Sequence, residues 1–210
     1  MATKKKEADP GKKPAISYWS KEKCVCPICK KAFEHEIMRS GNGRMIAGSL
    51  TEELHRNFEP SAKYGRVYPL IYEVGACPFC YSAFFWNDFT EKITSDDGDK
   101  IFEHSDRRKK ACEAIFPYFN LKKERSLLDG TAMYYLALMT YDDMGAYALP
   151  TMKKAIIALR LAWLTKEMNQ HCAGHNYDVV SKLFYSKALF FYQQAVFNET
   201  NRTEKSSTLL

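Results

Sequence analysis

Two cysteine pairs of the same form constrain this 210-residue chain more than any other feature. Each pair has two residues between its cysteines and a proline after the first: Cys26-Pro27-Ile28-Cys29 and Cys77-Pro78-Phe79-Cys80. A tight turn in such a pair presents both sulfurs to one ion, and the proline fixes φ within that turn. Zinc prefers four tetrahedral ligands, and thiolates are its commonest structural ligands. We therefore predict one metal site formed by Cys26, Cys29, Cys77 and Cys80.

The predicted ion is Zn²⁺. Iron would use the same four ligands, but nothing else in the sequence indicates electron transfer. Four thiolates complete the coordination and leave no position for water, so we expect a structural ion and no hydrolysis at the metal. Two other interpretations are weaker: buried reduced thiols leave the matched prolines unexplained, and a redox-active pair would need a βαβ context that is absent.

The other cysteines and histidines are weaker candidates for ligands. Cys24 lacks the two-residue spacing, and Cys112 and Cys172 are expected to be ordinary thiols. His35 stands between two glutamates and is expected to be exposed. One further cluster has ligand chemistry and precedes the last predicted helix: His171, Cys172 and His175. Its residues would have to converge from a glycine-containing segment, so we favour a solvated loop over a second metal site.

Charge and hydropathy restrict the class of protein further. The seven cysteines are odd in number and follow no secretory signal, so we expect reduced thiols and a cytoplasmic protein. The longest apolar run, residues 155–164, is broken by Arg160 and is far shorter than the ~20 residues of a membrane span, so no membrane is expected as a partner. Half of the net charge of +6 lies in residues 1–14, where five lysines oppose Glu7 and Asp9. A solvated arm is the preferred interpretation of that segment, over a nucleic-acid-binding arm.

The chain divides near residues 94–108 into two regions that differ in their predicted secondary structure. The polar run Ser95-Asp96-Asp97-Gly98-Asp99 is expected to be a solvated turn at this boundary. The predicted domains are a disordered Lys-rich arm (1–16), a zinc-ribbon-like module (17–94), a helical domain (108–197) and a disordered tail (198–210). The fold class is therefore α+β, mostly α, with a small metal module followed by helices.

The first region carries short, irregular elements that a bound metal would hold together. Strand-like patterns cover residues 66–72 and 81–86. Residues 50–58 are predicted to form a short helix, because Ser49 and Glu52 have the spacing of a capping box. Aromatic side chains surround the second cysteine pair and are expected to lie in the core, with stacking on nucleic-acid bases as the alternative: Phe79, Tyr81, Phe84, Phe85, Trp86 and Phe89.

The second region shows helical periodicity throughout. The clearest helix covers residues 151–169, in which one buried stripe is predicted for Met152, Ile156, Leu159 and Trp163, beside a small ridge of Ala155, Ala158 and Ala162. Further helices are predicted at 127–144, at 111–119 and along the stripe Val180, Phe184, Ala188, Phe191 and Ala195. Short links between long helices predict antiparallel helical hairpins.

Several short segments of the sequence occur in the same order as in a known protein family. They are the two cysteine pairs, Pro69-Leu70-Ile71-Tyr72-Glu73-Val74, Asp88-Phe89 and Ala162-Trp163-Leu164. In these the chain resembles a bacterial family of uncharacterised proteins, domain of unknown function 2225, over about residues 26–197. The resemblance implies tetratricopeptide-like helices after the cysteine pairs and implies no activity. Tyr81-Ser82-Ala83 replaces the Gly-Tyr-Ala of the family, so the turn after Cys80 is expected to differ.

The function hypotheses follow from these features. No nucleophile with a base, phosphate loop or paired carboxylates occurs in a recognisable setting, so we expect a protein that is not an enzyme and has no catalytic residues. The favoured hypothesis is a scaffold whose tetratricopeptide-like helices bind a protein or peptide on their concave face. The alternative is a zinc-ribbon nucleic-acid-binding protein, supported by the cysteine pairs, the lysine arm and the pI of about 8.8.

Overall fold

The computed structural model describes residues 18–39, 41, 45–89, 91, 93–171 and 174–204. The fold is mixed α/β and mostly helical. Its strands form three separate antiparallel pairs: β1 (Cys24–Val25) with β2 (Ala32–Phe33), β3 (Ile46–Leu50) with β4 (Arg56–Glu59), and β5 (Val74–Ala76) with β6 (Ala83–Phe85). The helices are α1 (Ser95–Glu103), α2 (Ser105–Ile115), α3 (Leu127–Thr140), α4 (Pro150–His171) and α5 (Tyr177–Thr200).

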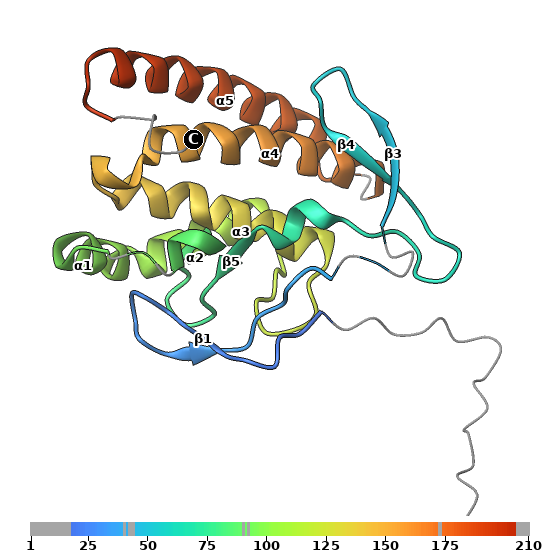
Figure 1. Ribbon diagram of the computed structural model, residues 1–210, viewed down its shortest axis with the longest axis horizontal. Coiled ribbons are helices and arrows are strands. Elements are labelled where there is room, and N and C mark those ends of the chain that lie inside the picture. Colours follow the sequence, from blue (N-terminus) through green and yellow to red (C-terminus); the bar gives the residue numbers. More distant parts are fainter. Residues whose placement is uncertain are drawn as a thin grey trace, which may run out of the picture.

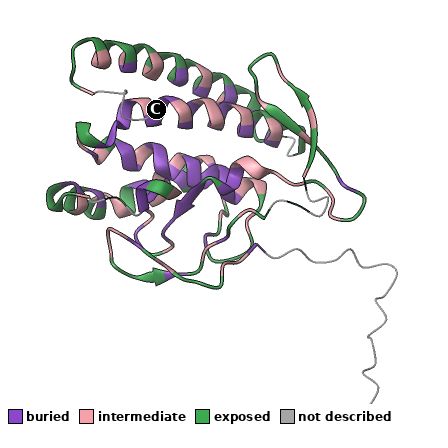
Figure 2. Cartoon of the chain, in the orientation of Figure 1, coloured by how far each residue is buried: buried purple, intermediate pink, exposed green. Residues whose placement is uncertain are grey.

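The three long helices lie side by side in one antiparallel stack, in the order α3, α4, α5 (Figure 1). The predicted helical hairpins are therefore confirmed. The two short strand pairs β1/β2 and β5/β6 lie on the other side of α3, which is the most completely buried helix (Figure 2). Ser126 begins α3 with a capping box, since its hydroxyl accepts from the amide of Asp129 and the Asp129 carboxylate accepts from the amide of Ser126.

Small side chains allow α4 to pack closely between its neighbours. The ridge of Ala155, Ala158 and Ala162 is fully buried, as predicted. The stripe that was predicted to be buried is only partly so, because Met152, Ile156, Leu159 and Trp163 all keep intermediate exposure. The larger buried side chains are instead on two other faces of the helix, since α4 has α3 on one side and α5 on the other: Ile157, Leu161, Leu164 and Met168.

The cysteine-bearing region (residues 18–89) and the helices share one hydrophobic core. The outer edge of β6 is closed by α3 and the turn after it, because the amide of Ala83 donates to the Thr140 hydroxyl (3.1 Å) and the amide of Phe85 to the Tyr141 hydroxyl (3.2 Å). Gly130 of α3 faces Ile71 in the short 3₁₀ helix Pro69–Tyr72. A Cβ at Gly130 would lie 2.3 Å from the Cβ of Ile71, so only glycine permits this approach.

Two buried ion pairs tie the module to the helices. Arg125, just before α3, lies 3.6 Å from the Glu36 carboxylate and donates to the carbonyl of Val74 (2.9 Å). Lys153 of α4 lies 2.8 Å from the carboxylate of Asp88. Burial raises the pKa of Glu36, and the Arg125 charge opposes that rise. Breaking such a buried pair leaves an uncompensated charge, so these contacts fix how the two regions fit together.

Residues 50–58 form a hairpin and not the predicted helix. The turn between β3 and β4 is closed by the amide of Thr51 donating to the carbonyl of His55 (2.9 Å), and Leu54 takes a left-handed φ of +58°. Tertiary contacts outweigh the local capping signal here. The His55 ring stacks on Trp163 of α4 at 4.4 Å, and Glu53 accepts from the indole of Trp163 and from the hydroxyl of Tyr185 in α5.

The polar run at residues 95–99 is the start of α1 and not a solvated turn, so helical structure begins well before residue 108. Thr94 accepts a hydrogen bond from the amide of Asp97, as an N-cap does. Acidic residues in a first turn are favoured by the helix dipole, which accounts for Asp96 and Asp97. The Asp97 carboxylate also accepts from the amide of Gly145 (3.0 Å), which fastens α1 to the α3–α4 link.

The other local predictions have mixed outcomes. The strand predicted at residues 66–72 is wrong, because Pro69–Tyr72 forms a 3₁₀ helix. The strand predicted at residues 81–86 is observed as the shorter β6. The predicted disorder of the tail is wrong for residues 198–204, which are held in place because the Glu204 carboxylate accepts a hydrogen bond from the hydroxyl of Thr151 (2.6 Å). The predicted arm, residues 1–16, and the end of the predicted tail, 205–210, lie outside the described residues. Within the described part of the chain, no helix is both long and apolar enough to cross a membrane.

Candidate metal centre

The four predicted cysteines come together at one point, where the β1/β2 and β5/β6 hairpins meet. The Sγ atoms of Cys26 and Cys80 are 3.6 Å apart, as are those of Cys29 and Cys77, and all four lie within 4.8 Å of one another. A tetrahedral zinc site with Zn–S distances of about 2.3 Å has sulfur–sulfur distances of about 3.8 Å. The sulfur cluster therefore has the size that a four-thiolate zinc site requires.

The two cysteine turns have the same backbone structure. In the first, the amide of Cys26 donates to the carbonyl of Lys31 (3.0 Å), and the amide of Lys30 donates to the carbonyl of Cys26 (3.0 Å). In the second, Cys77 donates to Ser82 (2.8 Å) and Tyr81 donates to Cys77 (3.0 Å). Each turn therefore presents its two sulfurs in the same way, and each is carried by its own strand pair.

The fourth position after the first cysteine is left-handed in both turns, with φ of +59° at Lys30 and +56° at Tyr81. Glycine adopts this conformation without strain, which gives a physical reason for the glycine that the family resemblance leads one to expect at position 81. Tyr81 adopts this conformation at a strain of roughly 1–2 kcal/mol, and the expected difference from the family's turn stays a prediction. Its ring is held edge-on to Phe119 at 6.3 Å.

The cluster is enclosed on most sides. Cys26, Cys77 and Cys80 are buried and Cys29 is partly exposed. The hydroxyl of Ser82 lies 3.2 Å from the Cys80 sulfur and 3.5 Å from the Cys26 sulfur, and the amide of Phe79 donates to the Cys77 sulfur at 3.5 Å. Donors of this kind disperse negative charge on thiolates and orient them. Ser82 was not singled out from the sequence, although its place two residues after Cys80 is a usable signal.

A buried arginine supports the second turn from behind. Arg108 of α2 is 2% exposed and donates to the carbonyls of Cys80 (3.1 Å) and Tyr81 (3.3 Å), while its other amine lies 3.5 Å from Asp143. Burial lowers its pKa, and the negative charges of Asp143, Cys80 and Cys26 oppose that effect. No spacing in the sequence indicated this residue, because it reaches the cluster only through the packing of α2 against the module.

The ionisation of the Cys26, Cys77 and Cys80 thiols is coupled. Hydrogen bonds from Cys77 and Cys80 lower the pKa of Cys26, and the same contacts raise that of Cys77 and raise that of Cys80 to about 11. Without a metal ion, the Cys26 sulfur would therefore carry the negative charge while Cys77 and Cys80 stay protonated. A divalent cation could replace those protons and stabilise all four thiolates, because metal binding displaces protons from cysteine ligands.

The other candidate ligands do not join the cluster. The Cys24 thiol points to the carbonyl of Val25 (3.9 Å), and the buried Cys112 thiol points to that of Ala132 (3.7 Å). His171 ends α4 and lies 3.3 Å from Glu167, and His175 stacks on Tyr177. Cys172 lies outside the described residues, so the second cluster stays an untested alternative.

His35 is partly buried and packs against Trp86 with the ring centroids 5.0 Å apart, so its predicted exposure is wrong. Burial accordingly lowers its pKa.

The fold and the cluster define a class: a mostly helical α+β protein in which four cysteines from two hairpins converge beside a helix stack. The sequence model of a family described as "Uncharacterized protein conserved in bacteria", domain of unknown function 2225, matches residues 19–209. The chain belongs to this family. It is also 33% identical over 193 residues to a Borreliella burgdorferi protein named "Uncharacterized protein", which covers 91% of this chain and 68% of that protein. No solved structure matches the chain.

Proposed function

We propose that this chain is a scaffold protein, not an enzyme, in which a structural Zn²⁺ on Cys26, Cys29, Cys77 and Cys80 holds a zinc-ribbon-like module against a tetratricopeptide-like stack of helices. The observation that carries the proposal is the closed four-sulfur cluster, with all sulfurs within 4.8 Å. A closed four-thiolate site has no open coordination position, which favours a structural ion. The antiparallel order of α3, α4 and α5 supports the comparison with a helical repeat that binds a protein or peptide.

Metal analysis tests the site directly. The purified chain should hold one equivalent of zinc, and Cys77→Ser should lose it, whereas Cys112→Ser should keep it because that thiol lies outside the cluster. Less than half an equivalent in the unchanged protein would contradict the metal proposal. One equivalent of iron in its place would contradict the choice of zinc while leaving the ligand set intact.

Partner capture from the native cell tests the scaffold role. Chemical cross-linking followed by mass spectrometry should recover one or more proteins whose cross-links map to the helices, and loss of zinc should weaken that capture. Cross-links confined to the metal module would contradict a binding role for the helices. Turnover of a substrate by the purified chain would contradict the assignment as a scaffold.

One observation favours the second candidate function, binding of nucleic acid through the zinc-ribbon-like module. Phe79 at the tip of the second cysteine turn is 44% exposed, and the ammonium groups of Lys31 and Lys122 lie 5.1 and 5.6 Å from its ring centroid. Exposed aromatic rings between cations stack on bases in single-stranded nucleic acids.

A salt titration distinguishes this function from the first. If the module binds RNA or DNA, affinity should fall steeply as salt rises, and Phe79→Ala should weaken it at every salt concentration. Phe197→Ala is the matched control, since Phe197 is an exposed phenylalanine on α5. No mobility shift at low salt would contradict this second function and leave the first unaffected.

A further inference from the structure

The outer face of α5 is apolar along most of the helix. The inner face packs on α4 through buried Phe184, Ala188 and Ala195. Six large apolar side chains elsewhere on the same helix keep between 50% and 67% of their surface exposed: Val179, Leu183, Leu189, Phe190, Val196 and Phe197. Figure 2 shows this outer side of α5 as an exposed edge of the helix stack. A surface helix normally has an apolar stripe on the side facing the core and polar residues on the other side.

The spacing of these residues is that of a helix-pairing seam. Leu183, Phe190 and Phe197 recur every seven residues, and Leu189 and Val196 form a second row with the same period. A seven-residue repeat keeps one line of side chains directed at a neighbouring helix over several turns. Isolated exposed apolar residues such as Leu54 need no such explanation, but two parallel rows between Leu183 and Phe197 do.

The exposed area is that of an interface. Fully exposed side chains of these types present roughly 100–200 Å² each, so the six leave about 600 Å² of apolar surface in contact with water. Monomeric proteins rarely expose a larger continuous patch, and a standard interface buries about 800 Å² on each partner. The apolar rows approach that size, and the exposed polar side chains between them, Ser186 and Gln193, add to the surface that a partner would cover.

We propose that the outer face of α5 binds the same face of a second copy of this chain, with the two α5 helices antiparallel about a two-fold axis near Phe190. This pairing sets Leu183 of each copy against Phe197 of the other. It does not depend on the zinc site or on the scaffold role, because α5 lies on the opposite side of the helix stack from β1 and β5, whose hairpins carry the cysteines (Figure 1).

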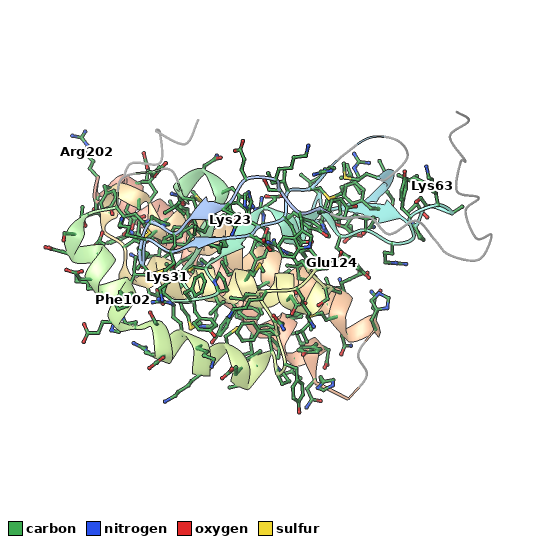
Figure 3. All side chains as sticks on the ribbon, turned by 90° about the horizontal axis from the view of Figure 1, so that it is seen from below. Lys23, Lys31, Lys63, Phe102, Glu124 and Arg202 are labelled. Atoms are coloured by element: carbon green, nitrogen blue, oxygen red, sulfur yellow. The ribbon has the colours of Figure 1, made fainter. Side chains whose placement is uncertain are left out.

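Charge favours a second copy in this orientation. Between Leu183 and Phe197 the sequence has a single charged residue, Lys187, so the seam itself carries little charge. Asp178 lies in the first turn of α5, where its carboxylate is 3.9 Å from the ammonium of Lys182, and Arg202 projects into solvent beyond the last turn (Figure 3). Antiparallel pairing brings the Asp178 end of each helix to the Arg202 end of the other, and opposes the two helix dipoles. Parallel pairing would instead set Lys187 beside Lys187.

The first test is the mass of the full-length protein in solution, measured by sedimentation equilibrium over a range of concentrations. The unchanged chain should be a dimer, and Phe190→Glu should weaken the dimer by at least about 30-fold, the effect of losing a central interface residue. Phe102→Glu is the matched control, because it adds the same charge at a phenylalanine of similar exposure in α1, which packs on α2 and on the turn after α3. A monomer at every concentration, or a dimer that Phe190→Glu leaves unchanged, would overturn the proposal.

The second test fixes the orientation by disulfide trapping under mild oxidation, with the unchanged chain giving the background from its own thiols. A mixture of Leu183→Cys and Phe197→Cys chains should form a cross-linked dimer. Neither variant should cross-link with itself, since the two copies of position 183 would be about 21 Å apart along antiparallel helices, beyond disulfide reach. Efficient self-linking of both single variants would overturn the antiparallel arrangement.

Discussion

Substituting the two helical glycines Gly130 and Gly98 by alanine should have opposite effects on stability. Alanine in place of glycine inside a helix lowers the free energy of the folded state by about 0.8–1.0 kcal/mol when nothing opposes the new methyl group. At Gly98 in α1 no atom lies within 4 Å of the added Cβ, so Gly98→Ala should gain about that amount. At Gly130 the same Cβ would lie 2.3 Å from the Cβ of Ile71 and 2.8 Å from its Cγ2.

The magnitude at Gly130 follows from that overlap. Carbon atoms in contact prefer about 3.5–4.0 Å, so α3 and the 3₁₀ helix at Ile71 would have to separate by more than 1 Å. Overpacking a buried site costs about 1–3 kcal/mol and occasionally more, which exceeds the gain in helix propensity. Gly130→Ala should therefore lose roughly 1–3 kcal/mol. Ile71→Ala should not rescue it, because the nearest atom is the Cβ that alanine retains.

Thermal unfolding with zinc held in excess measures both variants under the same conditions. For a chain of this size each kcal/mol shifts the midpoint by about 2–4 °C, so Gly130→Ala should melt about 2–12 °C lower and Gly98→Ala about 2–4 °C higher. Equal or greater stability of Gly130→Ala would refute the close approach of α3 to Ile71. A loss at Gly98 as large as that at Gly130 would refute the assignment of the difference to packing.

Three further predictions follow from the cluster and the buried histidines. Arg108→Met should lose roughly 1–3 kcal/mol of stability in urea unfolding, because the carbonyls of Cys80 and Tyr81 lose a donor while Asp143 keeps His104 as a partner. Zinc affinity in a competition titration should fall about 10–100-fold, and an unchanged affinity would contradict the support that Arg108 gives to the second cysteine turn. A strong chelator should lower the unfolding midpoint of the native chain far more than that of Cys77→Ser, and equal shifts would show that the ion does not stabilise the fold. Burial lowers the pKa of His35 and His55, so below pH 6.5 the unfolded chain binds more protons than the folded chain. The stability from these two rings should therefore be full above pH 6.5 and fall as the pH drops toward the folded pKa values. His55→Gln should show a shallower loss of stability between pH 7.5 and 5.5, and an identical slope would contradict the burial of that ring.

The features predictable from the sequence were those with a fixed local spacing. The cysteine pairs identified the whole cluster, and the periodicity of Phe184, Ala188 and Ala195 identified the inner face of α5. The predictions that failed concern contacts between residues that are far apart in the sequence. The capping-box spacing at Ser49 favours a helix, but Glu53 gains more from Trp163 and Tyr185 in a hairpin. The role of Arg108 likewise arises only when α2 packs on the module, and no short-range pattern encodes that contact.

The β3/β4 hairpin lies within the 47 residues that separate Cys29 from Cys77. With an ion bound as proposed, that segment becomes a closed ring, and by the entropy relation for cross-linked chains a ring of this size limits the unfolded state by about 4 kcal/mol. The tip of the ring rests on α4 and α5 through Glu53. Release of the ion would therefore loosen the contact at Trp163, although neither helix supplies a ligand. The cysteines and the helix pair would communicate through the length of chain between them.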